Sequence, residues 1–115
     1  MVSKIDVNMS ICDKKVSVTA TANEDGTISI GIESDCSFLN AYANNLRVIT
    51  MDDIMCFEKS RINNEEVRGN MSMICAAPIA VYQAAWMECG MLSKKNYIKS
   101  GPVTMDIGDV ERDRA

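Results

Sequence analysis

Histidine is absent from this chain of 115 residues, and this absence excludes several common kinds of chemistry. Without an imidazole there is no Ser-His-Asp or Cys-His catalytic arrangement, and a metal would have to be held by thiolates, carboxylates or neutral oxygen atoms. The chain also has no Cys-x-x-Cys pair, so the cysteine spacing most typical of zinc and redox sites is missing. These absences argue against an ordinary hydrolase or zinc protease, and we expect a protein that is not an enzyme.

Positive charge and long apolar runs are scarce as well. The chain has 12 basic and 16 acidic residues, its formal net charge is −4, and its basic side chains form no cluster. Nucleic-acid binding needs a positively charged surface that neutralises phosphates, so we expect no nucleic-acid partner. No apolar run approaches the roughly 20 residues of a membrane-spanning helix, and the first eight residues contain no apolar signal region. We therefore expect a cytoplasmic protein without membrane attachment.

The remaining composition is that of a small globular protein. Hydrophobic residues make up 47% of the chain, which is enough for one modest core without disulfides. We expect a single domain over residues 1–115, with an ordered part at about 3–107 and a charged tail at 108–115.

The first third of the chain alternates apolar and polar residues with a period of two, which is typical of half-buried strands. Such runs cover residues 4–9, 15–22 and 27–32. Asp25-Gly26 lies between the last two runs and is a strong hairpin signal, because glycine tolerates a positive φ. We therefore expect a three-stranded antiparallel meander.

Helical spacing replaces the period of two after residue 34. Apolar residues recur at helical intervals over 38–46, after candidate caps at Ser34 and Asp35. A shorter helix is expected over 51–57, and a polar connection over 60–71. These segments place a layer of helices after the meander.

The strongest helical signal covers residues 72–92. It is rich in alanine, and Pro78 falls in the first turn, where its missing N–H costs little. We expect residues 75–90 to pack as a helix on one sheet face, with the lysine pair at 94–95 near its C-terminal end. Residues 102–107 alternate again and predict a short C-terminal strand. The predicted fold class is α+β, and the residues expected in its core are Val16, Val18, Ile28, Ile30, Leu39, Ile79 and Trp86.

Three of the five cysteines lie at the edges of these predicted elements. Cys12 precedes a strand, Cys36 opens a helix, and Cys75 opens the alanine-rich helix. If the helices pack over the sheet, the three thiols can converge on one point, where a metal ion or an iron–sulfur cluster would bind. The field at a helix N-terminus stabilises a thiolate, and we expect this at Cys36 and Cys75.

A carboxylate next to the thiols would complete such a site. Asp13 follows Cys12 and Asp35 precedes Cys36, so either side chain can be the fourth ligand of a tetrahedral zinc or bind an iron of a cluster. The remaining cysteines, at 56 and 89, lie inside apolar helical patterns, and we expect small buried hydrophobic residues there. The same alternative applies to the other three, because free cysteine is among the most buried residue types.

Four segments carry a resemblance to a known family over roughly residues 3–92. They are Cys12-Asp13-Lys14-Lys15-Val16, Asn23-Glu24-Asp25-Gly26-Thr27-Ile28, Ser34-Asp35-Cys36-Ser37 and Cys75-Ala76-Ala77-Pro78-Ile79. In this order and spacing they resemble the U-type iron–sulfur cluster assembly scaffolds, the IscU/NifU family.

The chain also departs from the pattern of that family. Asp13 follows Cys12 directly, where the family has an intervening glycine, and Ile74 stands where the family has a histidine before its third cysteine. The chaperone-binding Leu-Pro-Pro-Val-Lys segment is absent. The chain is at least as similar to uncharacterised small cysteine-containing proteins of anaerobic archaea and bacteria, so we interpret it as a divergent relative of the scaffolds.

The resemblance implies a SufE/IscU-like fold and a site at Cys12, Cys36 and Cys75 for an iron–sulfur cluster, or alternatively for zinc. Asp13 is the best candidate for a fourth ligand. We expect a non-enzymatic scaffold or carrier whose protein partner is a metalloenzyme or a donor or acceptor of clusters. Two alternatives stay open: an accessory subunit of a larger anaerobic metalloenzyme complex, and a sulfur carrier with a persulfide on Cys75 or Cys36.

Overall fold

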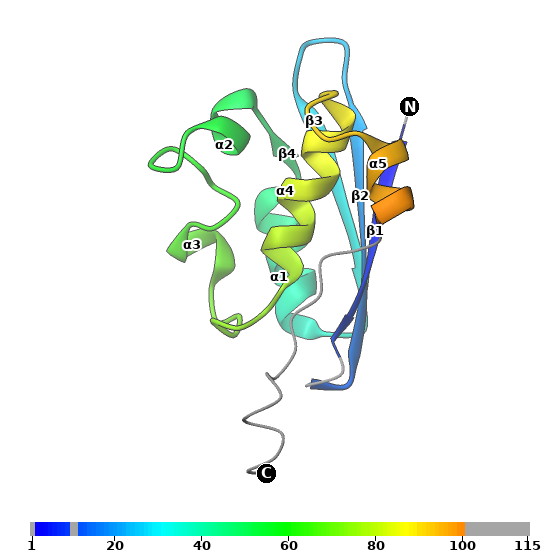
Figure 1. The fold of residues 1–115 in the computed structure, drawn as a ribbon. Coiled ribbons are helices and arrows are strands. Elements are labelled where there is room, and N and C mark those ends of the chain that lie inside the picture. Colours follow the sequence, from blue (N-terminus) through cyan, green and yellow to red (C-terminus); the bar gives the residue numbers. More distant parts are fainter. Residues whose placement is uncertain (1, 10–11, 101–115) are drawn as a thin grey trace, which may run out of the picture.

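The computed structural model describes residues 2–9 and 12–100 of the protein. In this range the fold is α+β, with an antiparallel sheet followed by helices that pack against it (Figure 1). The strands follow the order of the chain across the sheet, and they are β1 (Val2–Met9), β2 (Lys14–Ala22), β3 (Ile28–Ser34) and β4 (Val48–Ile49). The helices are α1 (Ser37–Leu46), α2 (Met51–Met55), α3 (Glu65–Arg68), α4 (Ala77–Glu88) and α5 (Lys94–Ser100). The predicted meander of three strands is confirmed, and β4 extends it at the β3 edge.

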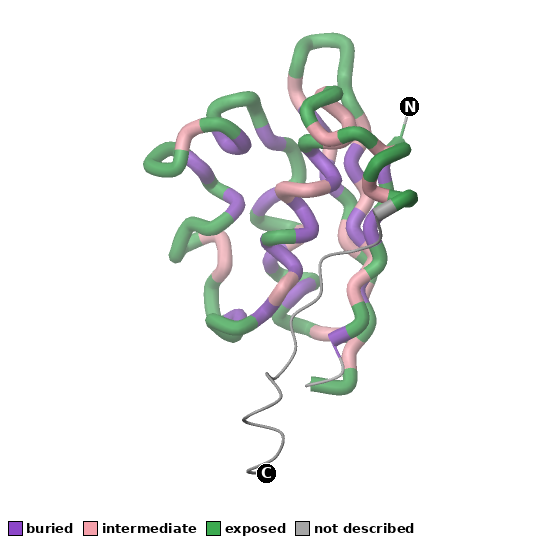
Figure 2. Tube along the Cα trace, in the orientation of Figure 1, coloured by how far each residue is buried: buried purple, intermediate pink, exposed green. Residues whose placement is uncertain are grey.

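The register of the sheet follows from the period-two pattern of the sequence. Ile5 lies opposite Val18, and Val18 lies opposite Ile32. Ile28 and Ile30 are both buried, as the alternation predicts. Buried positions recur at alternate residues along β1 and β2 (Figure 2), and α4 packs against these two strands. The inward side chains of the meander therefore form the part of the core that belongs to the sheet.

The alanine-rich helix α4 packs on β1 and β2 with a different face from the one we expected. Ile79 is 52% exposed and Trp86 is 38% exposed, so the prediction that both belong to the core is wrong. The buried side of α4 consists mainly of alanines, because small side chains let the helix lie close to the sheet. The indole N–H of Trp86 instead donates to the carbonyl of Ile54 in α2, 3.2 Å away. The residues that α4 buries are Ala77, Pro78, Ala80, Val81, Ala84 and Ala85.

The C-terminal part of the chain also differs from expectation. The lysine pair at 94–95 begins a separate helix, α5, and does not end α4. Helix α4 ends at Glu88, and Gly90 follows it with φ +77°, a conformation that glycine adopts without strain. The predicted strand at 102–107 and the predicted tail at 108–115 lie outside the described residues.

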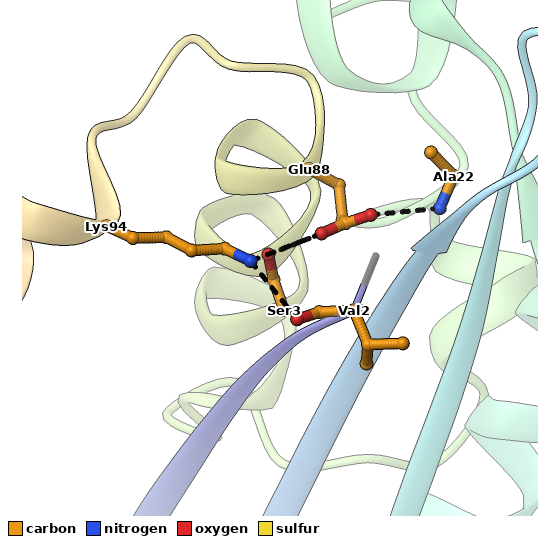
Figure 3. Close-up of polar contacts among 5 residues, drawn as sticks. All are labelled: Val2, Ser3, Ala22, Glu88 and Lys94. Atoms are coloured by element: carbon orange, nitrogen blue, oxygen red, sulfur yellow. Dashed lines mark hydrogen bonds and ion pairs between the residues drawn. The ribbon is translucent and has the colours of Figure 1, made fainter.

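A polar cluster ties α4 and α5 to the first two strands (Figure 3). The side chain of Glu88 is 1% exposed and accepts hydrogen bonds from the hydroxyl of Ser3 at 2.7 Å and from the N–H of Ala22 at 3.1 Å. Lys94 lies 3.5 Å from the Glu88 carboxylate and donates to the carbonyl of Val2 at 3.1 Å. The ends of β1 and β2 therefore meet α4 and α5 at one carboxylate that the protein covers.

A second buried acid fixes the start of α2. The carboxylate of Asp53 accepts the N–H of Thr50 at 2.8 Å, which is its part of a capping box at the start of α2. The same oxygen also accepts the hydroxyl of Thr50, and the other carboxylate oxygen accepts the N–H of Arg61. The guanidinium of Arg61 in turn donates to carbonyls at the end of α1, those of Asn45 and Leu46.

Among the described residues, no helix is long and apolar enough to cross a membrane.

Candidate functional site

Cys12, Cys36 and Cys75 line one cavity of about 300 Å³, which we call the thiol cavity. It lies where β1 ends and β2 begins, beside the N-terminal ends of α1 and α4. The three cysteines come from distant parts of the sequence, and the meander and the two helices bring them to the same place, as the element boundaries predicted. The other residues that line the cavity are Met9, Lys14, Phe38, Leu39, Met71, Ser72 and Ile74.

Cys36 is the N-cap of α1 and is half-buried. Its backbone N–H donates to the hydroxyl of Ser34 at 3.2 Å, and this short turn leads the chain from β3 into the helix. The sequence suggested Ser34 or Asp35 as the cap, and the structure moves the cap one or two residues along the chain. Cys36 therefore lies at a helix N-terminus, as predicted.

Cys75 has a different environment from the one that its sequence position suggests. It is 9% exposed and precedes Ala76, the N-cap of α4. Burial raises the pKa of the Cys75 thiol, and this effect outweighs the hydrogen bond from Ala77 and the charge of Arg68, which lower it. The expected stabilisation of a Cys75 thiolate is therefore wrong, because desolvation costs more than the helix start provides.

The other two thiols of the cavity also act on Cys75. Negative charge on Cys12 and on Cys36 raises the pKa of Cys75 further. Cys12 is exposed, and its thiol donates to the carbonyl of Met9 at 3.6 Å. The cavity thus holds three thiols in three environments, from exposed Cys12 to buried Cys75.

The two carboxylates that sequence reasoning placed beside the thiols line a different pocket. Asp13 has φ +56°, a left-handed conformation that aspartate tolerates in turns. Asp13 and Asp35 line a polar pocket together with Asn8, Lys14 and Lys15, and Lys14 lies 3.7 Å from Asp35. Lys14 lines both the thiol cavity and this polar pocket.

The thiols share a cavity without forming a preassembled metal site. Within residues 2–9 and 12–100, no group of three or more His, Cys, Asp or Glu side chains is positioned to hold a metal ion. A single ion bound by all three thiolates would need sulfur atoms about 3.8 Å apart around one point, given metal–sulfur bonds of about 2.3 Å. Binding one ion through all three cysteines would therefore require their side chains to move.

Cys56 and Cys89 lie outside the thiol cavity, as predicted, but neither is fully buried. The thiol of Cys89 contacts the sulfur of Met51 at 3.7 Å, near the far end of α4. Cys56 lines a separate pocket between α2 and α4. Both cysteines are half-buried, so the expectation that they are fully buried hydrophobic residues is wrong.

Sequence reasoning missed the methionines of the site. Met9 and Met71 are buried and line the thiol cavity, and the sulfur of Met9 lies 3.8 Å from that of Cys75. In the sequence Met9 is simply the last inward residue of a strand, and methionine is common core filler. Its position three residues before Cys12 was the available signal.

These features define the class of the protein: an α+β fold in which an antiparallel sheet and two helix N-termini enclose an apolar cavity lined by thiols. Comparison with protein families gives the identity at the level of the family. The family described as "Family of unknown function (DUF6951)" matches residues 3–100, and the chain belongs to it. Neither the curated proteins nor the solved structures give a match. The matched range contains all five cysteines and both layers of the fold.

Proposed function

We propose that the protein is a non-enzymatic scaffold or carrier that binds an iron–sulfur cluster, or alternatively a metal ion such as zinc, at Cys12, Cys36 and Cys75. The observation that carries this proposal is that three thiols from distant segments line one apolar cavity. Thiolates are the ligands that iron–sulfur clusters and zinc share. The resemblance of the cysteine segments to the U-type scaffolds points in the same direction.

The geometry of the cavity favours a cluster over a single zinc ion. One zinc requires its sulfur ligands around one point, and the described side chains offer no such group. A cluster contains several irons, and its cysteine ligands bind different irons, so they can stand further apart. A volume of about 300 Å³ leaves room for such an inorganic core between the thiols. The apolar lining would also limit the access of water to the cargo.

The fourth ligand position of a cluster would be open to a partner. Asp13, the candidate from the sequence, would have to leave its polar pocket to reach the thiols. Phe38 and Ile74 line the cavity and are exposed, and Met73 beside them is exposed as well. We propose that a metalloenzyme or a donor or acceptor of clusters docks on these apolar side chains in the cytoplasm. An open position suits a protein that accepts and releases its cargo.

A second apolar surface supports the alternative of an accessory subunit. Met55, Phe57 and Ile79 are exposed on α2, the turn after it and α4, and Phe57 is 90% exposed. Large exposed apolar side chains on neighbouring elements are typical of interaction surfaces. In this alternative the protein is a docking component of a larger metalloenzyme complex.

Anaerobic purification followed by iron, acid-labile sulfide and zinc analysis tests the proposed function. The wild-type chain should contain iron and sulfide, and Cys75→Ser should lose both because the cluster loses a ligand. Cys89→Ser is the matched control, because its thiol also contacts a methionine sulfur but lies outside the cavity, and it should keep the wild-type content. Circular dichroism of each variant checks that the fold persists. Zinc without sulfide would support the metal alternative, and equal contents in all three proteins would refute a site at these thiols.

A further inference from the structure

Met9 lines the thiol cavity and contacts two of its three cysteines. It is the last residue of β1, is 8% exposed, and lies between two of the cysteines. Its sulfur is 3.8 Å from the sulfur of Cys75, and its carbonyl accepts the thiol of Cys12 at 3.6 Å. One methionine thus contacts two thiols that come from opposite parts of the chain.

The sulfur–sulfur distance fits two ligands of one metal ion. With metal–sulfur bonds of about 2.3 Å, two ligands in tetrahedral or trigonal geometry lie about 3.8–4.0 Å apart. Met9 and Cys75 already have this separation, so they could bind one ion without a change in the backbone. The sulfurs of Cys89 and Met51 are equally close, at 3.7 Å. The two pairs differ in their surroundings, because the cavity beside Met9 and Cys75 also holds the thiols of Cys12 and Cys36.

The donors of the thiol cavity are soft. Three thiols and the thioethers of Met9 and Met71 line it, whereas Asp13 and Asp35 line the neighbouring polar pocket. Soft thiolate and thioether ligands together suit copper(I), and oxygen ligands suit harder cations.

We propose that Met9 is a metal ligand, and that Met9, Cys75 and a second cavity thiol form a binding site for a soft monovalent cation of the copper(I) class. This inference rests on the proposed function in one respect, namely that the cysteines of the cavity act as ligands. It goes further by naming a thioether ligand and the class of ion that such a ligand selects. The thioether takes the place that sequence reasoning gave to the carboxylate of Asp13.

Copper(I) titration of the apo-protein tests the proposal. Under anaerobic conditions, copper(I) is added in competition with a chromophoric copper(I) chelator, and zinc is titrated in parallel. Met9→Leu keeps the volume of the side chain and removes the sulfur. Loss of a ligand should weaken copper(I) binding by about tenfold or more, since even lost second-shell contacts cost about that much. The zinc affinity should stay within about twofold, because thioethers contribute little to zinc sites.

Two control variants make the result specific. Met51→Leu removes the thioether of the other cysteine–methionine contact and should leave copper(I) binding unchanged. Cys75→Ser should lose copper(I) binding together with its thiolate ligand. Thermal melts of the variants without metal identify a change in folding. A Met9→Leu protein that folds and binds copper(I) as tightly as wild type would overturn the proposal, as would an equal loss of copper(I) and zinc binding.

The proposed function and this inference can fail separately. One outcome is that iron and sulfide content depends on Cys75 but not on Met9, and that Met9→Leu binds copper(I) as tightly as wild type. This outcome would support the cluster proposal and refute the thioether ligand. Copper(I) binding that depends on Met9 in a protein that never holds iron or sulfide would support the thioether ligand and refute the cluster.

Discussion

The side chains of the thiol cavity differ more in their surroundings than in their chemistry. Cys12 is exposed, Cys36 is half-buried and Cys75 is buried, although all three line one space. Desolvation has the largest effect on the pKa of Cys75. Burial raises this pKa, whereas the N–H of Ala77 and the charge of Arg68 lower it by less. A thiol at the start of a helix is therefore reactive only if water reaches it as well.

Alkylation of the folded apo-protein should separate these cysteines. With iodoacetamide at neutral pH, we expect Cys12 to react first and Cys75 much more slowly, because burial excludes the reagent and keeps the Cys75 thiol protonated. Raising the pH increases the thiolate fraction of Cys75 and should accelerate its reaction. Mass spectrometry of peptides over time measures both rates. Cys75 reacting as fast as Cys12 in the folded protein would contradict the burial described here; in denaturant the two should converge.

That Cys12, Cys36 and Cys75 line one cavity could be predicted from the sequence, whereas the other side chains of that cavity could not. Each of these cysteines lies at the end of a predicted element. The meander and the helices place those ends side by side, so Cys12, Cys36 and Cys75 line one cavity. Asp13 has a left-handed backbone conformation and lines the neighbouring polar pocket, a placement that its position next to Cys12 does not indicate. Met9 was missed because an inward methionine in a strand looks the same whether it fills the core or faces a site.

At the scale of elements, the reliability of sequence patterns follows from their periodicity. The strands alternate with a period of two, so both their extents and their inward faces were predictable. Helix α4 is apolar all round, so its sequence offered no polar face to identify the buried side. Strand β4 is two residues long and too short for any period. The lysines at 94–95 suit a helix end by charge, but here they begin α5.

The packing of α4 predicts that enlarging a small buried side chain destabilises the protein more than truncating a large exposed one. Ala84 is fully buried against the sheet, so Ala84→Leu should overpack the interface and lower the free energy of unfolding by about 1–3 kcal/mol. Ile79 is exposed on the same helix, so Ile79→Ala should change it by about 0.5 kcal/mol or less. Urea denaturation measures both values. A larger cost for Ile79→Ala than for Ala84→Leu would mean that α4 turns its other face to the sheet.

The cluster around Glu88 predicts a pH-dependent link between α4, α5 and the strands. Burial raises the pKa of Glu88, but the hydrogen bonds from Ser3, Ala22 and Lys94 together lower it below the ordinary value of 4.5. Folding therefore weakens proton binding, so the carboxylate contributes its full stability above the unfolded pKa. That contribution is lost as the pH falls through the folded pKa.

Glu88→Gln tests this link. Removing the charge and one acceptor oxygen should lower the free energy of unfolding at pH 7 by about 1–3 kcal/mol. The difference between variant and wild type should shrink on acidification, because wild-type Glu88 then becomes protonated. Urea denaturation at several pH values between 7 and 3 measures the difference. A gap between the two proteins that stays constant down to pH 3 would show that the Glu88 charge contributes nothing.

At the scale of the whole molecule, helices α1 and α4 both pack on the sheet, and each contacts mainly different strands of it. Helix α4 lies on β1 and β2, and α1 lies on β3. The smaller helices join these layers, since α3 contacts α1 and α2 contacts α4. Because these elements share one core, we expect the part of the chain that the structure describes to unfold as one cooperative domain.

Equilibrium unfolding monitored by two probes tests that cooperativity. The single tryptophan, Trp86, reports on the contact between α4 and α2, and far-ultraviolet circular dichroism reports on the whole backbone. In urea the two transitions of the apo-protein should coincide in midpoint and slope. An earlier fluorescence transition would identify α2 and its neighbours as a separate, less stable unit.

The hydrogen bond between Ser3 and Glu88 joins residues that are 85 positions apart in the chain, and this separation has a kinetic meaning. Closing a loop costs conformational entropy that rises with loop length and must be offset by contacts formed within the loop. The hairpins β1–β2 and β2–β3 close far shorter loops, so we expect them to form earlier. Glu88 then reaches Ser3 after the intervening chain has ordered, and the docking of α5 through Lys94 belongs to the last steps of folding.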